Sequence, residues 1–178
     1  METQPRQFVR DSLSASVAEF FASYGVTCDT VEEPAVEQPA DDVELGSMIG
    51  FRGKTVRGGL AFVAPVDLLS DMLPVPKDPE HADSQLRDWS AEIANQLVGR
   101  LKNKLAARSV DFDVGTAVSF TGKSIRLVFL PDAEGLSLSF RAGATSVRVH
   151  LDCALSAQLE SGKVEELRIV PEGDVLLF

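Results

Sequence analysis

Hydrophobic residues recur every three or four positions along two long stretches of the chain, which is the period of an amphipathic α-helix. The first stretch covers residues 7–25, where Gly25 provides a stop signal. Its apolar stripe contains Val9, Leu13, Val17, Phe20 and Tyr24. The second stretch covers residues 83–107 and is the longest helix that the pattern predicts. Each helix therefore has one apolar face that another part of the fold must cover.

Shorter segments between and after these helices alternate or run apolar, as β-strands do. Residues 43–51 and 56–64 flank a short turn that contains Gly53, so we expect them to form a β-hairpin. A strand-like start at residue 26 precedes an acidic, proline-containing loop, and residues 65–73 are predicted to form a short helix. Four further strands are predicted at residues 111–120, 124–130, 136–141 and 146–153.

The order of helix, strands, helix, strands predicts an α+β fold, in which two long helices pack on one face of a mostly antiparallel sheet. A chain of 178 residues has the length of one domain, and we expect residues 1–178 to form a single domain. The pattern of residues 155–178 is ambiguous, although residues 164–170 are a candidate for one more strand.

The composition narrows the choice of partner and of compartment. The chain has 17 Lys and Arg residues against 27 Asp and Glu, a net charge of −10 that repels both nucleic acid and anionic membranes. No segment approaches the roughly 20 apolar residues that span a bilayer, and the polar start does not resemble a signal peptide. The only cysteines, Cys28 and Cys153, lack metal-ligand spacing and are expected in the core. A cytoplasmic protein that binds neither nucleic acid nor membrane is therefore expected.

The long second helix carries a polar stripe opposite its apolar face. At about 100° per residue, the polar or small residues fall within one narrow sector of the helical wheel. These residues are Asp88, Glu92, Asn95, Gly99 and Lys102. The opposite sector contains Leu86, Trp89, Ile93, Leu97, Leu101 and Leu105. The pattern predicts that the helix buries the apolar sector and exposes the polar one.

Three residues of this stripe suggest chemistry performed on another molecule. Glu92 and Asn95 are three residues apart, so their side chains project from one face in successive turns. Gly99 follows one turn later, although a glycine costs a helix interior about 1 kcal/mol relative to alanine. A carboxylate can pair with a cation of a partner, an amide can orient water, and the glycine leaves room for close approach.

These residues give the chain a resemblance to the CheC, CheX and FliY family of response-regulator phosphatases. The family pattern is Asp or Ser, then Glu four residues later, then Asn three residues after that, and here it is matched by Asp88, Glu92 and Asn95. The continuation to Gly99 and Lys102 is also similar to the family. The likeness extends more loosely over most of residues 7–153.

The resemblance implies that the chain removes phosphate from the aspartyl phosphate of a CheY-like receiver domain. Glu92 would form a salt bridge with the active-site lysine of the receiver, and Asn95 would hold the attacking water in line. Asp88 would have at most a supporting, orienting role. The chain would need no cofactor of its own, because the receiver would supply its Mg²⁺. Phosphoryl transfer depends strongly on positioning, so one amide can suffice.

The chain also departs from the family pattern. Residues 113–118 lack a proline that often begins the strand after the helix. A second copy of the motif, which some members carry on the first helix, is replaced by Ala15 and Ala18 within residues 11–18. One site per chain resembles the CheX branch, whose members pair through their sheets, so a homodimer is expected.

Other interpretations of the same residues stay open. The polar stripe could be an ordinary solvated face, or the fold could be a non-catalytic module that only binds a receiver or a scaffold. Around Gly53, the residues Arg52, Lys54 and Arg57 could hold an anion, but a solubilising hairpin end is the simpler interpretation. His81 and His150 have no ligand at metal spacing, so zinc is not expected. The acidic pairs Asp67/Asp71 and Asp111/Asp113 are interpreted as surface charge.

Overall fold

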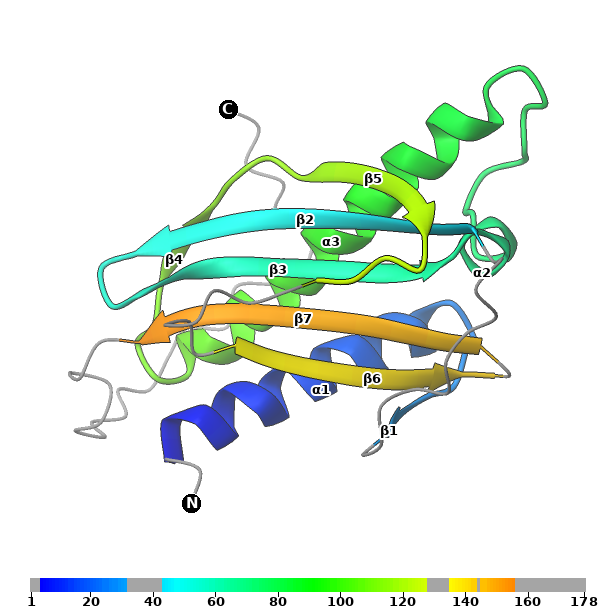
Figure 1. The fold of residues 1–178 in the computed structure, drawn as a ribbon. Helices are drawn as coiled ribbons and strands as arrows, with labels where there is room; N and C mark the ends of the chain where they lie inside the picture. The colour runs from blue at the N-terminus through cyan, green and yellow to red at the C-terminus, as the bar shows by residue number, and fades with distance from the viewer. Residues whose placement is uncertain (1–3, 32–42, 128–134, 144, 156–178) are drawn as a thin grey trace.

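The chain folds into one antiparallel sheet with its helices on one face (Figure 1). The computed structural model describes residues 4–31, 43–127, 135–143 and 145–155. The helices are α1 (Gln4–Ser23), α2 (Val66–Asp71) and α3 (Ala82–Ala106). The strands are β1 (Cys28–Val31), β2 (Val43–Gly53), β3 (Val56–Pro65), β4 (Phe112–Val114), β5 (Val118–Lys123), β6 (Gly135–Ala142) and β7 (Thr145–Leu155). The prediction of an α+β fold with helices on one sheet face is confirmed.

The strand order differs from the order along the chain. Strands follow the path β1-β6-β7-β3-β2-β4, and β5 also pairs with β2. The strand predicted at residues 111–120 is wrong as a single element, because β4 pairs with residues 51–53 of β2 and β5 with residues 43–48. Between them, the Gly115 N–H donates to the Gly50 carbonyl oxygen at 2.8 Å. Two short strands therefore cover one edge of β2.

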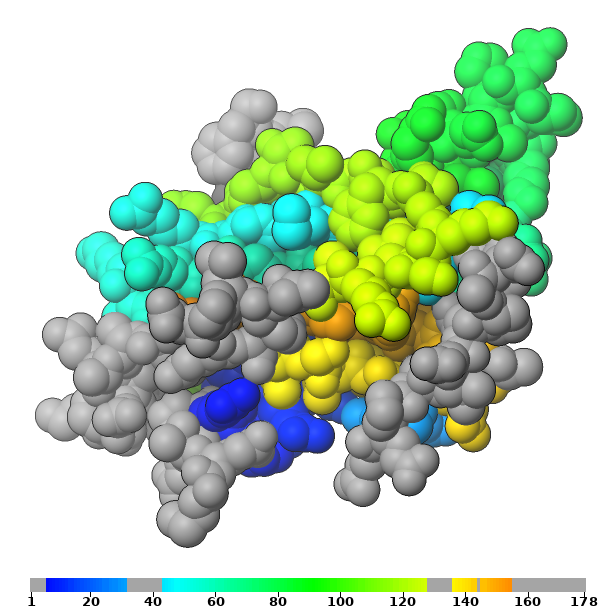
Figure 2. Space-filling model, in the orientation of Figure 1, coloured from blue at the N-terminus to red at the C-terminus, as the bar shows by residue number. Residues whose placement is uncertain are grey.

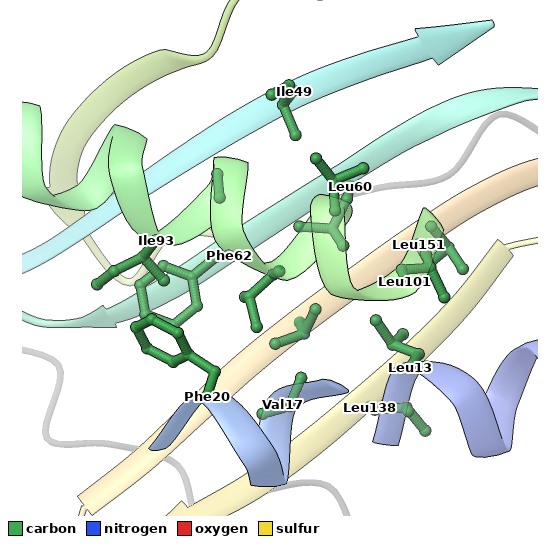
Figure 3. Packing of buried hydrophobic residues seen from close by; sticks show 14 of the residues in the cluster. Leu13, Val17, Phe20, Ile49, Leu60, Phe62, Ile93, Leu101, Leu138 and Leu151 are labelled. Carbon is green, nitrogen blue, oxygen red and sulfur yellow. The ribbon is translucent and has the colours of Figure 1, made fainter. Parts of the chain in front are cut away.

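The core lies between the sheet and the two long helices. Apolar side chains of α1 and α3 point towards residues of β2, β3, β6 and β7 (Figure 3). The largest fully buried side chains include Phe20 from α1, Phe62 from β3 and Ile93 from α3. Burial of a side chain of this size contributes about 1.5–3 kcal/mol each, so this interface fixes which face each helix turns inward.

The first helix ends as its sequence predicts. Gly25 has a φ of +72°, a left-handed conformation that glycine adopts without steric cost. The Val26 N–H then donates to the Phe21 carbonyl oxygen, and the Gly25 N–H donates to that of Ala22, both at 3.0 Å. These two bonds satisfy carbonyls at the helix end and turn the chain towards β1.

The strand predicted at residues 124–130 is wrong over residues 124–127, and the remainder lies outside the described residues. After β5, residues 124–127 run across the sheet face that carries no helices (Figure 1, Figure 2). The Ile125 N–H donates to Glu44 Oε2 at 2.8 Å, and Arg148 Nη1 donates to the Ile125 carbonyl oxygen at 2.7 Å. Arg148 and Glu44 also form an ion pair. The side chains of Glu44 and Arg148 therefore bond to the backbone N–H and carbonyl oxygen of Ile125, and these two groups do not pair with a neighbouring strand among the described residues.

Several other expectations concern single residues. Cys28 and Cys153 are both buried, as predicted. Burial, with the nearby Asp29 carboxylate, raises the pKa of the Cys28 thiol to about 12. The strand considered at residues 164–170 lies outside the described residues. Within the described part of the chain, no helix combines the length and the apolar character that crossing a bilayer requires.

Candidate functional site

Helix α3 exposes its polar stripe and buries its apolar face, as the helical wheel predicts. Asp88, Glu92 and Asn95 are exposed, and Gly99 is half-buried. The buried face contains every predicted apolar residue and also Ser90, Ala94 and Val98. The helix is anchored by Leu86, Trp89, Ile93, Leu97, Leu101 and Leu105, and Asp88, Glu92 and Asn95 are exposed on its opposite side.

Aromatic packing fixes α3 against α1 at the level of the polar stripe. The ring of Trp89 lies 5.2 Å from that of Tyr24 and 6.3 Å from that of Phe20, measured between centroids. Trp89 directly follows Asp88 and is 5% exposed, so its indole turns inward where Asp88 turns outward. Such aromatic pairs contribute about 0.5–1.5 kcal/mol beyond the area they bury. The turn of α3 that contains Asp88 and Trp89 is therefore packed tightly against α1.

The loop before α3 is organised by Asp78. Its Oδ2 lies 2.8 Å from His81 Nδ1, and its Oδ1 accepts the Glu80 N–H at 3.0 Å. These two hydrogen bonds hold the pKa of the Asp78 carboxyl below its usual range. His81 thus has a structural role at the start of the helix.

Glu92 is held by its own helix. Gln96 Nε2 donates a hydrogen bond to Glu92 Oε1 at 2.9 Å. Pairs at this spacing on a helix surface contribute only about 0.2–0.5 kcal/mol. The carboxylate is therefore oriented along the stripe, yet a cation from a partner could replace the amide at small cost. Gln96 was not among the predicted site residues, although its spacing of four from Glu92 is a signal that could have revealed it.

Asn95 and Gly99 provide the accessible chemistry and the space. Asn95 is exposed, and its side chain makes no hydrogen bond with any residue that the structure describes. A Cβ built on Gly99 would meet no atom within 4 Å beyond its chain neighbours and the adjacent backbone of its own helix. The internal packing of the chain therefore does not require a glycine here, and an alanine would fit. This observation favours a role for Gly99 towards something outside the chain.

Lys102, the last member of the stripe, is engaged within the fold. Its Nζ lies 3.2 Å from Asp111 Oδ1 and 5.7 Å from the centroid of the Phe112 ring. The two contacts join the C-terminal end of α3 to the start of β4. Lys102 therefore supports the site, and the stripe that is open to a partner runs from Asp88 to Gly99.

The remaining candidates do not join this site. Arg52, Lys54 and Arg57 are exposed, and Arg52 lies directly opposite Arg57 across the hairpin. Burial, reinforced by the positive charge of Arg148, lowers the pKa of His150 to about 4. Asp67, Asp71, Asp111 and Asp113 are exposed, as expected for surface charge. Among the described residues, no group of three His, Cys, Asp or Glu side chains could hold a metal ion.

Comparison with known proteins relates the chain to one family. A family model described as chemotaxis phosphatase CheX matches residues 45–141, which is more than half of the chain. This region contains most of β2, the whole of β3, α3, β4 and β5, and nearly all of β6, whereas β7 lies outside it. The search of curated proteins finds no match.

Solved structures share the fold at low sequence identity. Chemotaxis protein CheX from Vibrio vulnificus is 17% identical, with a TM-score of 0.68, over 82% of this chain and 96% of that one. A CheC-like superfamily protein from Shewanella sp. PV-4 is 16% identical, with a TM-score of 0.69, over 83% and 97%. A CheX from Borrelia burgdorferi, solved in complex with CheY, BeF3 and Mg²⁺, is 14% identical, with a TM-score of 0.61, over 83% and 96%.

Proposed function

Because the chain belongs to the CheX family of chemotaxis phosphatases, we propose that it dephosphorylates the aspartyl phosphate of a CheY-like receiver, with Glu92 and Asn95 as the essential pair. The observation that carries the proposal is the exposed pair itself. The Asn95 amide has no partner among the described residues, and the space beside Gly99 is open. A carboxamide that is exposed on a well-packed helix, with no partner among the described residues, is suited to orienting a water molecule.

The proposed mechanism assigns one task to each residue. Glu92 exchanges its hydrogen bond with Gln96 for a salt bridge with the active-site lysine of the receiver, which aligns the two proteins. Asn95 then reaches the phosphoryl group and holds a water molecule in line for attack on phosphorus. Positioning of this kind can lower a barrier by several kcal/mol, because the water loses its freedom before the reaction starts. Asp88 lies one turn before Glu92 and has a supporting role in orienting the partner.

The proposal assigns the phosphoaspartate and the Mg²⁺ to the receiver. Phosphoryl transfer needs both charge neutralisation and positioning. A receiver that brings its own metal supplies the charge neutralisation, so the chain has only to position the water. The CheX of Borrelia burgdorferi, which was solved with CheY and Mg²⁺, motivates this choice of partner class.

The rival proposal is a binding module that docks on a receiver without accelerating hydrolysis. The absence of a proline in residues 113–118 is the observation in its favour, because the strand after α3 begins differently from the family pattern. This stretch is also where the edge of the sheet is interrupted between β4 and β5.

The two proposals differ in a single assay. Each receiver encoded in the same genome is phosphorylated by a small phosphodonor in the presence of Mg²⁺, and phosphate release is followed with and without the purified chain. The phosphatase proposal expects faster release from at least one receiver at substoichiometric chain concentration. Binding of a phosphorylated receiver with unchanged release would establish the module, and neither binding nor release would reject both.

Substitutions at Gly99 are expected to separate stability from docking. Gly99→Ala should raise the free energy of unfolding by about 1 kcal/mol, since alanine favours the helix and its Cβ meets open space. Gly99→Gln should not lower the free energy of unfolding below that of the native chain. It should weaken binding of the receiver about 10-fold, because the longer side chain fills that space. Urea unfolding and titration calorimetry measure the two effects. Unaltered affinity in the glutamine variant would exclude this surface from the interface.

We further propose that the chain forms a homodimer through the sheet face opposite the helices. Ser47 contacts α3, so its neighbour Met48 projects from the other face of β2. Met48 is 51% exposed, and its cross-strand partner Val118 is 60% exposed. Sedimentation should give a dimer for the native chain and a monomer for Val118→Lys. A native chain that sediments as a monomer at micromolar concentration would contradict the proposal.

A further inference from the structure

Three serines form a continuous hydrogen-bonded chain beneath the exposed site. Ser90 lies on the buried face of α3, Ser47 on β2 and Ser119 on β5. Ser47 Oγ lies 2.8 Å from Ser90 Oγ and 2.8 Å from Ser119 Oγ. Ser119 Oγ in turn donates to the carbonyl oxygen of Arg87 at 2.9 Å. The serine chain therefore begins and ends on the same helical turn of α3 and passes through two strands.

The direction of each hydrogen bond follows from the number of protons. A serine hydroxyl carries one proton, and that of Ser119 is donated to Arg87. Ser47 must then donate to Ser119, so Ser90 must donate to Ser47. All three hydroxyls therefore donate in the same direction, from Ser90 towards Arg87. Ser47 and Ser90 are fully buried. Such aligned hydrogen bonds strengthen one another, and a gap would leave a buried hydroxyl without a partner.

The turn that the serine chain holds is the one that bears the exposed residues. Asp88 follows Arg87 directly, and Glu92 follows Ser90 by two residues, which places Glu92 on the opposite side of the helix. Most of the buried face of α3 consists of aliphatic side chains, whose packing is not directional. Hydrogen bonds are directional, so those that join α3 to Ser47 of β2 and Ser119 of β5 restrict rotation of the helix about its axis.

A small rotation would matter at the site. If α3 turned by about 20°, a side-chain tip about 6 Å from the helix axis would move by about 2 Å. A misplacement of about 1 Å can reduce the rate of a positioned reaction about 100-fold. A structural element that suppresses rotation therefore affects the orientation of Glu92 and Asn95 more than it affects whether the helix forms.

We infer that Ser47, Ser90 and Ser119 are positioning residues, which set the rotation of α3 so that Glu92 and Asn95 project in the geometry that the reaction needs. The inference rests on the proposed phosphatase function. The serines touch neither partner nor phosphate; they act through the helix. Ser119 is the most informative member, because it is half-buried and its removal leaves the two buried serines bonded to each other.

The test compares Ser119→Ala, which breaks the serine chain, with Ser119→Thr, which retains the hydroxyl on a residue that strands accept. Ser16→Ala is the matched control. It removes a fully buried serine hydroxyl, which donates to the Ser12 carbonyl oxygen at 2.7 Å and stays within α1. Phosphate release from a phosphorylated receiver gives kcat and KM, and hydrogen exchange of the backbone amides of residues 87–95 reports on the held turn.

We expect Ser119→Ala to lower kcat about 10-fold with KM within about twofold of the native value, because docking survives and alignment does not. Amide exchange in residues 87–95 should accelerate about 5-fold. Ser119→Thr should restore both quantities, and Ser16→Ala should change neither.

Two results would overturn the inference in distinguishable ways. An active native chain whose kcat is unchanged by Ser119→Ala, or lowered equally by Ser16→Ala, would reject the positioning role and leave the phosphatase intact. A native chain without phosphatase activity on any receiver would reject the proposed function and the positioning role together.

Discussion

Replacing Asn95 with alanine is expected to lower phosphate release from the receiver about 100-fold while its binding to the chain stays within about twofold. Removal of one group that orients or stabilises the reacting atoms costs about 10²–10³ in rate in well-studied enzymes. Asn95 is exposed, and its amide bonds to no described residue, so its loss leaves no unsatisfied group in the fold. The measurements are single-turnover phosphate release and calorimetric binding.

Asn103→Ala is the matched control for this experiment. Asn103 is also exposed on α3, two turns beyond Asn95, and lies outside the proposed contact with phosphate. It should retain the native rate, and both variants should unfold at the native temperature within about 2 °C. A chain that loses equal activity through either asparagine would indicate a general effect on the helix surface, and full activity in Asn95→Ala would end the assignment.

The largest loss of stability is expected from Arg148→Met. The Glu44 carboxyl is 4% exposed, and its partner Arg148 is 25% exposed. Removing only the arginine leaves a buried carboxylate whose remaining partner is the N–H of Ile125. Breaking a buried ion pair in this way costs about 3–5 kcal/mol, and the partial exposure of Arg148 argues for about 3 kcal/mol. Urea unfolding followed by circular dichroism measures the change.

Two further variants interpret that result. Arg141→Met removes an exposed arginine from β6 and should cost less than about 0.5 kcal/mol. Combining Glu44→Leu with Arg148→Met should recover much of the lost stability, because no uncompensated charge stays in the interior. If Arg148→Met unfolds at the same urea concentration as Arg141→Met, the ion pair between Arg148 and Glu44 does not stabilise the fold.

The helices and the exposed pair could be predicted because their determinants are local. In α3, the period of 3.6 residues identifies the buried face and the exposed side, on which Glu92 and Asn95 lie. The hairpin of β2 and β3 was also predictable from its turn. In these elements, each residue's environment depends on neighbours a few positions away.

The errors arose where distant residues decide the structure. Residues 124–127 have the alternation of a strand, but Glu44 and Arg148 take the backbone groups of Ile125. The serine chain could not be predicted either, since Ser47, Ser90 and Ser119 meet only once the register of two strands and the seating of α3 are known. A single serine in a helix or strand carries no local signal of such a contact.

The position of β7 in the sheet has a consequence for how the protein matures on the ribosome. This strand is made after β2 and β3, yet it lies between β3 and β6 in the interior of the sheet. A growing chain that has not yet released residues 145–155 exposes the bare edge of β3 and lacks Arg148. Strand pairings between residues far apart in the sequence form slowly. Until they form, the unpaired strand edge can associate with that of another unfinished chain. Folding should therefore finish only when β7 has emerged, and chains truncated before residue 145 should aggregate.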